Sequence, residues 1–204
     1  MQGFVLIDKP QGFTSFDAVA VMRGAAGTKK VGHTGTLDPM ATGVLPILIG
    51  RATKLLDLLP EQNKRYTATI RLGEETDTLD ITGRVVRTTG LFAPPQEIAA
   101  VLNTFQGSQM QVPPMYSAVQ KNGQRLYDLA RKGLEVEREA RPVTIHSIAM
   151  TACRPDKREY DLDVLCSKGT YIRSLCHDLG RALGCGAVLA ALRRTEACGF
   201  NLTQ

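Results

Sequence analysis

Residues 65–73 show the clearest alternation of apolar and polar positions in the chain. Every second side chain of a strand points to the same face, so this segment predicts a half-buried β-strand. The positions on its apolar face are Tyr66, Ala68, Ile70 and Leu72. Tyr66 is therefore expected to point towards the core, or towards a pocket that the core borders. A packed core tyrosine is the more common case.

Short apolar runs bounded by turn residues predict further strands. They are residues 4–7, 44–49 (a buried strand or turn), 84–87, 115–120, 142–151, 159–166 and 197–202. Helical spacing of apolar positions predicts helices between these strands. They are residues 14–27, 51–59 (ending before Pro60), 96–105, 124–132 and a segment opened by Lys168-Gly169-Thr170 that stops at Gly184. Clusters of strands separated by helices predict an α+β fold with a mixed, mainly antiparallel sheet flanked by helices and loops.

The length predicts one globular domain over residues 1–204, with two small domains as the alternative. Hydrophobic content is 43% and charged content 22%, both ordinary values for a globular protein. The net charge of +5 favours a polyanionic partner only weakly. The first residues lack the pattern of a signal peptide, and the longest apolar run, 44–49, contains Pro46 and cannot span a bilayer. The five cysteines form no C-x-x-C pair and only three histidines occur. Reduced thiols in a cytoplasmic protein are therefore expected, with no metal site.

The stretch Gly32-His33-Thr34-Gly35-Thr36-Leu37-Asp38-Pro39-Met40-Ala41-Thr42-Gly43 fits neither a stable helix nor an alternating strand. It predicts a structured loop, a common place for functional residues. Pro39 biases the backbone of Asp38 towards extended geometry. An Asp before a Pro is also a favoured helix start, so Asp38 is either a functional carboxylate or the N-cap of a very short helix.

Three other charged features have two interpretations each. Lys9, in a Lys-Pro-x-Gly turn, either holds an anion or lies in solvent, the commoner case. The acidic residues 74–83 lack the spacing of a calcium loop, which favours a solvated loop over a cation site. Arg173 lies in the first turn of its helix, where the dipole disfavours a cation, so it either has a carboxylate partner or extends into solvent.

Four motifs together carry a family resemblance. They are Asp8-Lys9-Pro10-x-Gly12, Gly32-His33-Thr34-Gly35-Thr36-Leu37-Asp38-Pro39, Arg65-Tyr66 and Lys168-Gly169-Thr170-Tyr171-Ile172-Arg173. In this order and spacing the chain resembles the TruB family of tRNA pseudouridine synthases from Phe4 to Phe200. The resemblance implies the pseudouridine synthase fold and the isomerisation of the T-loop uridine, position 55, to pseudouridine. It implies no metal and no organic cofactor.

The resemblance also assigns roles to individual residues. Asp38 matches the catalytic aspartate, which acts at the ribose as nucleophile on C1′ or as base at C2′. Arg173 matches the arginine that pairs with this aspartate. Tyr66 matches the tyrosine that stacks on the target base and is a candidate relay for the proton that leaves C5. Tyr171 and Leu192 map onto positions that line the pocket.

Further residues are implied to bind RNA or support the site. His33 matches the residue that fills the gap left by the flipped base. Lys9 supports the pocket, and Gly32 and Thr34 belong to the central motif as substrate or RNA contacts. Residues of about 113–141 correspond to a mobile thumb, whose cations, among them Arg125 and Arg141, would contact phosphates. Four acids in this segment keep an ordinary solvated face as the alternative.

Bacterial members of the family usually continue into a small C-terminal PUA domain, whereas this sequence stops at Gln204. Either a truncated piece or a natural short form is expected, with weaker RNA binding. We expect a monomer that acts on the tRNA T-arm and needs no protein partner or membrane. The alternatives are an RNA-binding module that assists tRNA folding through the same cleft, and a synthase of the same fold acting on ribosomal or guide-directed RNA. A glycoside hydrolase is disfavoured because paired carboxylates are not evident.

Overall fold

The apolar run around Val44 forms a buried strand in the computed structural model, which describes residues 2–59 and 62–203. By clustering of contacts the chain divides into two compact units. Unit 1 comprises Met1–Thr67, Val164–Lys168 and Ala191–Gln204, and unit 2 comprises Ala68–Asp163 and Gly169–Ala190. Strands β4, β11 and β12 contribute residues to both units, and their bounds are Lys64–Leu72, Glu159–Cys166 and Ala187–Ala197.

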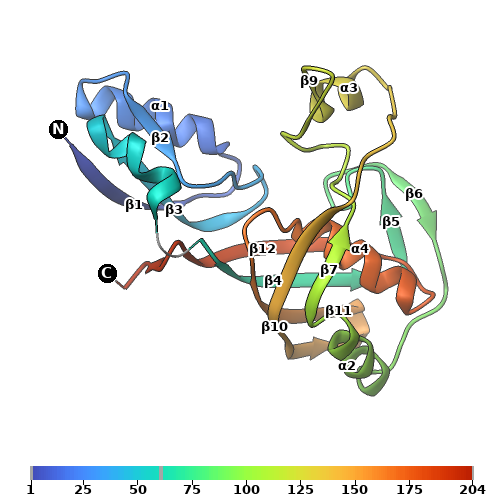
Figure 1. The fold of residues 1–204 in the computed structure, drawn as a ribbon. Coiled ribbons are helices and arrows are strands. Elements are labelled where there is room, and N and C mark those ends of the chain that lie inside the picture. Colours follow the sequence, from blue (N-terminus) through green and yellow to red (C-terminus); the bar gives the residue numbers. More distant parts are fainter. Residues whose placement is uncertain (1, 60–61, 204) are drawn as a thin grey trace. The chain divides into compact units, whose positions relative to one another are not determined.

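Unit 1 places helical segments beside a group of short strands (Figure 1). Its other elements are β1 (Gly3–Lys9), α1 (Ser15–Ala26), β2 (Val31–His33), β3 (Thr42–Ile49), the 3₁₀ helix η1 (Gly50–Leu58) and β13 (Phe200–Asn201). Helix α1 begins with the predicted capping box, in which the Thr14 side chain and the Asp17 carboxylate exchange hydrogen bonds with backbone N–H groups. The apolar face of α1 packs on β2 and β3. This core cluster consists of Ala18, Val19, Val31, Leu45, Ile47 and Ile49.

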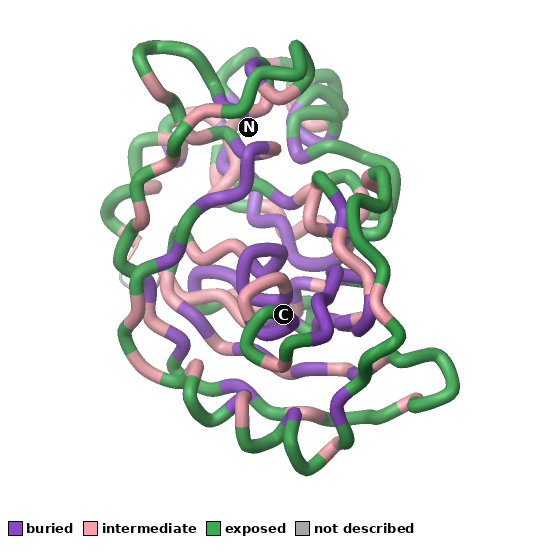
Figure 2. Tube along the Cα trace, turned by 90° about the vertical axis from the view of Figure 1, so that its right-hand side faces the viewer, coloured by how far each residue is buried: buried purple, intermediate pink, exposed green. Residues whose placement is uncertain are grey.

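Unit 2 contains the remaining elements. They are β5 (Glu74–Thr76), β6 (Val85–Thr88), α2 (Pro95–Thr104), β7 (Gly107–Gln111), β8 (Gln120–Lys121), β9 (Gln124–Arg125), α3 (Leu126–Arg131), β10 (Arg141–Arg154), η2 (Pro155–Lys157) and α4 (Ile172–Ala182). Helix α2 packs against β10 and α4. Buried residues lie mainly on strands and on α4, whereas many residues of the turns and loops are exposed (Figure 2).

Hydrogen-bonded neighbours in the large sheet run in the order β1-β3-β12-β4-β11-β10-β7, with β2 on β3 and β13 on β12. Strands β1 and β3 are antiparallel from Gly3↔Ile49 to Lys9↔Gly43, and β10 pairs antiparallel with β7. Strands β3 and β12 are parallel, with Arg194 opposite Gly43. The expected α+β fold with a mixed, mainly antiparallel sheet is confirmed.

Two predicted strands are wrong over most of their length. Residues 115–118 form bends and only Gln120, the first residue of β8, is in a strand. The backbone groups of the bend pair locally, with Ser117 N–H donating to Met115 C=O and Tyr127 N–H to Ser117 C=O. The final strand begins earlier than predicted, as β12, and the chain then turns at Cys198 and Gly199. Both turn residues have positive φ values, 55° and 78°, which interrupt a strand over residues 197–202.

Other boundaries shift by less. The predicted helix over 51–59 is a 3₁₀ helix, and its predicted stop at Pro60 lies outside the described residues. Helix α3 is shorter than the predicted 124–132, because its first two residues belong to the β8–β9 hairpin. Strand β7 was not predicted, since Gly-Ser-Gln-Met-Gln has little apolar alternation.

Candidate active site

The loop that carries Asp38 connects β2 to β3 in unit 1 and contains no helix. The helix N-cap interpretation of Asp38 is therefore wrong. A turn closes after it, with Ala41 N–H donating to Asp38 C=O at 3.0 Å. The structured loop is confirmed for residues 34–41, but both ends of the motif are strand: Gly32 and His33 end β2, and β3 begins at Thr42.

Hydrogen bonds to Ser15 and Gly12 hold this loop at the residues directly before and after Asp38. The buried Ser15 hydroxyl accepts from Leu37 N–H at 2.8 Å and donates to Leu37 C=O at 3.1 Å. Gly12 N–H donates to Pro39 C=O at 2.8 Å. Both neighbours of Asp38 are thus tied to the segment that runs from the end of β1 to the start of α1. These ties limit where the half-buried Asp38 carboxylate can lie.

Lys9, at the end of β1, is fully buried at 0% exposure, so the expectation that it lies in solvent is wrong. Its ammonium donates to the carbonyls of Pro10 at 2.9 Å and Phe13 at 2.6 Å. These two bonds close the turn that follows β1. Burial lowers the pKa of Lys9, while the nearby Asp38 carboxylate opposes that change. Lys9 therefore supplies positive potential in the Asp38 environment and braces the turn.

Tyr66 lies on β4 with 6% exposure, as the alternation predicts. Burial raises the pKa of its phenol to about 12, and the positive charge of Arg194 opposes the rise. The Asp38 carboxylate is close enough to contribute to the same rise. Tyr66 is consequently a neutral phenol at pH 7, able to stack on a base and to accept or pass on a proton.

His33 is half-buried and uses its Nδ1 as an acceptor for the Gly35 N–H at 3.2 Å. That bond places the proton of the neutral ring on Nε2. Burial, with a smaller effect of Arg194, lowers the pKa of His33. The ring is therefore favoured as a flat, neutral group, suited to stacking.

The remaining candidates in unit 1 lie on β2, β12 and the loop. Thr34 donates its N–H to Pro46 C=O at 3.1 Å, and its Oγ1 is buried without a hydrogen-bond partner among the described residues. Gly32 pairs with Leu48, and a Cβ there would meet only the Thr53 methyl at 3.9 Å. Leu192 is buried at 7% exposure on β12.

Arg173 lies in the first turn of α4, in unit 2, with 4% exposure. It donates to Thr78 C=O at 3.1 Å and Tyr116 C=O at 2.8 Å, and its Nη1 lies 3.9 Å from the Asp80 carboxylate. The solvent alternative is therefore wrong, and the expected carboxylate partner includes Asp80. Buried carbonyls and a buried acid offset the unfavourable helix dipole.

Asp80 is the functional candidate that sequence reasoning missed, because residues 74–83 were expected to be a solvated loop. That expectation is wrong: the segment opens with β5, and Asp80 is 4% exposed. Its Oδ1 accepts from Thr82 N–H and the Thr78 hydroxyl, both at 2.9 Å. Ile81 N–H donates to Leu189 C=O at 3.0 Å, which fixes the segment to β12. The threonines two residues before and after Asp80 were the available signal, since such residues bind a carboxylate locally.

Tyr171 is held by its backbone at the start of α4. Its N–H donates to Gln111 Oε1 at 2.8 Å, and its carbonyl accepts from Gln111 Nε2 at 3.1 Å. Gln111, on β7, is 3% exposed. This two-bond clamp fixes where the helix begins and hence where Arg173 projects.

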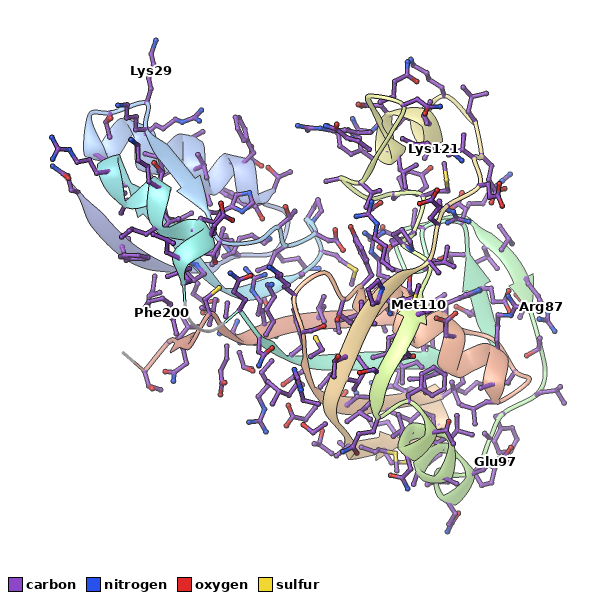
Figure 3. All side chains as sticks on the ribbon, viewed as in Figure 1. Lys29, Arg87, Glu97, Met110, Lys121 and Phe200 are labelled. Carbon is purple, nitrogen blue, oxygen red and sulfur yellow. The ribbon has the colours of Figure 1, made fainter. Side chains whose placement is uncertain are left out.

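The predicted thumb has a small core of its own, formed by Met115, Leu126 and Leu129. The exposed Arg125 donates to the Tyr127 hydroxyl at 2.9 Å, and the Arg131 guanidinium lies 5.4 Å from the centre of the Tyr127 ring. Lys121, on the β8–β9 hairpin, donates to Glu137 C=O at 2.6 Å (Figure 3). Arg141 is exposed at the start of β10. The segment thus presents cations around an aromatic ring, an arrangement suited to RNA.

Residues 2–59 and 62–203 contain no group of three or more His, Cys, Asp or Glu side chains placed to hold a metal ion. The five cysteines are free thiols, with Cys153 exposed and the others buried. Among the same described residues, every helix is too short or too polar to cross a membrane.

Comparison with known families assigns residues 23–172 to the TruB family pseudouridylate synthase N-terminal domain, and residues 173–204 to the tRNA pseudouridylate synthase B C-terminal domain. The chain belongs to the TruB family. The resemblance drawn from the four motifs is confirmed.

Curated relatives agree with this assignment. The chain is 50% identical over 204 residues to tRNA pseudouridine synthase B of Clostridium kluyveri, covering 100% of this chain and 70% of that protein. It is also 50% identical to tRNA pseudouridine synthase B of Alkaliphilus oremlandii, covering 99% of this chain and 67% of that protein.

Solved structures share the fold. A Cbf5-Nop10-Gar1 complex matches with a TM-score of 0.73 and 32% identity, over 96% of this chain and 48% of the matched chain. An H/ACA RNP bound to a substrate RNA containing 2′-deoxyuridine matches with a TM-score of 0.71 and 29% identity, over 98% of this chain and 49% of the matched chain. The expected pseudouridine synthase fold is thereby confirmed.

The structure brings Lys9 and Tyr66 into the electrostatic environment of Asp38 in unit 1. In unit 2 it surrounds Arg173 with Asp80 and buried carbonyls. The Asp38–Arg173 pair implied by the family joins residues of different units and stays a prediction.

Proposed function

We propose that this chain isomerises the uridine at position 55 of the tRNA T-loop to pseudouridine, with Asp38 acting at the ribose. The observation that carries the proposal is the Asp38 loop itself. It bears the complete family motif, and backbone hydrogen bonds at Leu37 and Pro39 hold it beside the neutral phenol of Tyr66. Relatives that are 50% identical over 202 to 204 aligned residues are named tRNA pseudouridine synthase B.

The reaction breaks the N1–C1′ bond, turns the base over and forms a C5–C1′ bond. Asp38 acts either by adding to C1′ or by taking a proton from C2′, and in both cases it must be ionised. The base finally loses its C5 proton and carries a proton on N1, so atoms and charge balance without a cofactor. In this proposal Tyr66 stacks on the base and relays the C5 proton.

The target base must leave the folded T-loop before this chemistry, which costs a few kcal/mol of stacking. We assign the compensating contacts to the flat, neutral His33 ring, which takes the place of the flipped base, and to the cations of the thumb, including Arg125 and Arg141. Phosphate contacts of this kind position RNA without reading its sequence. Arg173 supports the Asp38 carboxylate in this proposal, and Asp80 holds Arg173 in place.

The decisive experiment incubates Asp38→Asn with an unmodified T-arm stem-loop and measures both pseudouridine and RNA affinity. We expect product to be lost while the dissociation constant stays within about twofold, because the substitution removes the charge and keeps the size of the side chain. Asp57→Asn, at an exposed acid on η1 of the same unit, is the control and should retain full activity. Normal pseudouridine formation by Asp38→Asn would show that another residue acts at the ribose.

The alternative of an RNA-folding module makes a different prediction in the same experiment. Such a module would assist T-arm folding equally well with or without Asp38, and the wild-type protein would form no pseudouridine. A synthase directed at another RNA would leave the T-arm unmodified but act on a ribosomal stem-loop. The identity to curated tRNA pseudouridine synthases favours the T-arm.

A further inference from the structure

Two adjacent arginines on β12 have opposite environments. The Arg193 side chain is 43% exposed and forms an ion pair with Asp8 at 2.8 Å. Arg194 is 0% exposed and is among the largest fully buried side chains. A buried guanidinium is costly unless its donors are satisfied, so its contacts identify what it holds in place.

The Arg194 guanidinium reaches the loop that carries Asp38. Its Nε donates to Val44 C=O at 2.7 Å, its Nη2 to Gly35 C=O at 3.1 Å and its Nη1 to Thr36 C=O at 3.4 Å. Two of these carbonyls lie three and two residues before Asp38, and the third belongs to β3 beyond it. One planar group therefore ties the entry of the loop to the strand that follows it.

The same guanidinium also acts on side chains of the site. Its charge lies within electrostatic range of the Tyr66 phenol and of Lys9, His33 and Lys64. Four elements, β1, β2, β4 and β12, thus direct cationic or neutral polar groups at one small region of unit 1. Positive potential there favours the ionised form of a carboxylate in the same environment.

We propose that Arg194 is a positioning residue for the reaction. Its guanidinium fixes the backbone of Gly35 and Thr36, which lead into Asp38, and its charge keeps the Asp38 carboxylate ionised. This inference rests on the proposed function of Asp38. Arg194 holds Gly35 and Thr36, and Ser15 holds Leu37, so the three residues directly before Asp38 are all fixed. Each contact is to backbone, so both residues act on Asp38 through the chain and need not touch substrate.

The test compares single-turnover rates, RNA affinity and pH–rate profiles on an unmodified T-arm stem-loop. Arg194→Lys keeps the positive charge but not the planar guanidinium. The single-turnover rate should therefore fall about tenfold, and the acidic limb of the pH–rate profile should not move. Arg194→Gln loses both, and we expect a fall of about a hundredfold with the acidic limb moved to higher pH. Ser15→Ala should slow the rate about threefold with no movement of the limb. RNA affinity should stay within about twofold throughout.

Arg193→Gln is the matched control and should leave the rate and the acidic limb unchanged, since its guanidinium contacts the side chains of Asp8 and Thr42 and not the backbone of residues 34–41. A folded Arg194→Gln variant with wild-type rate and acidic limb would overturn the proposal. If both Arg194 variants fail to fold by thermal unfolding, Ser15→Ala decides, because a wild-type rate there excludes positioning through the loop backbone. Failure of the proposed function is separate: the wild-type protein would then form no pseudouridine on the T-arm.

Discussion

At the scale of single residues, burial of polar groups identifies the important positions. Lys9, Asp80, Arg173 and Arg194 are each exposed by 4% or less. Charged side chains are almost never buried to this extent without partners, because losing hydration costs several kcal/mol. Here the three cations donate to carbonyls, and Asp80 accepts from Thr78 and Thr82. These partners belong to the segments that carry or support the proposed chemistry.

The raised pKa of Tyr66 predicts a pH dependence of stability. The unfolded phenol has a pKa of about 10 and the folded one of about 12, so the stabilisation is complete below pH 10 and is lost as pH rises towards 12. At pH 11 the loss should be about 1.4 kcal/mol. Urea unfolding at pH 8 and pH 11 should therefore show a larger fall for the wild-type protein than for Tyr66→Phe.

Tyr116→Phe is the control in this measurement and should fall as much as the wild-type protein. An equal fall for Tyr66→Phe and the wild-type protein would show that the Tyr66 phenol ionises normally in the folded state.

At the scale of elements, the contact between β3 and β12 depends on a glycine. Gly43 has φ of +106°, and a Cβ there would lie 2.1 Å from the carbonyl oxygen of Arg194. No real Cβ approaches a backbone oxygen so closely, and L-residues rarely adopt that φ. The parallel pairing of β3 with β12, which sets Arg194 beside the Asp38 loop, therefore requires glycine at this position.

Two glycine-to-alanine substitutions test this requirement. Gly43→Ala should destabilise the protein by about 3 kcal/mol or more, because it combines a strained backbone with overpacking. Gly24→Ala, inside α1 where a Cβ meets no atom within 4 Å, should stabilise it by about 0.5–1 kcal/mol. Urea unfolding measures both. A Gly43→Ala protein as stable as the wild type would contradict the close approach of β3 to β12.

At the scale of the whole molecule, the two compact units share strands. β4, β11 and β12 each contribute residues to both units. If one unit melted, part of each of these strands would melt with it. We therefore expect a single cooperative unfolding transition.

Native-state hydrogen exchange of Ile47 in unit 1 and Ile145 in unit 2 tests this cooperativity. Val19→Ala removes a buried group of the unit 1 core, where Val19 is 2% exposed. It should lower the protection of both amides by the same free energy, on the order of 1–3 kcal/mol. Faster exchange confined to Ile47 would show that the units unfold independently.

The sequence by itself determined what depends on neighbours in the chain. The alternation in β4 predicted the burial of Tyr66, the Thr14–Asp17 capping box predicted the start of α1, and the family motif identified Asp38. These features are local because strand alternation and helix caps involve residues within a few positions. The membership of the TruB family followed from the spacing of its motifs.

Only the tertiary structure decided which charges are buried and what they contact. Lys9 was expected in solvent and Asp80 in a solvated loop, yet both are buried. Arg194 drew no attention in the sequence, although it reaches carbonyls about 150 residues away. A local pattern carries no information on desolvation, because the cost and the compensating hydrogen bonds both come from strands brought together by the sheet. The sheet therefore determines which charged groups surround Asp38, whereas the sequence motif by itself identifies Asp38.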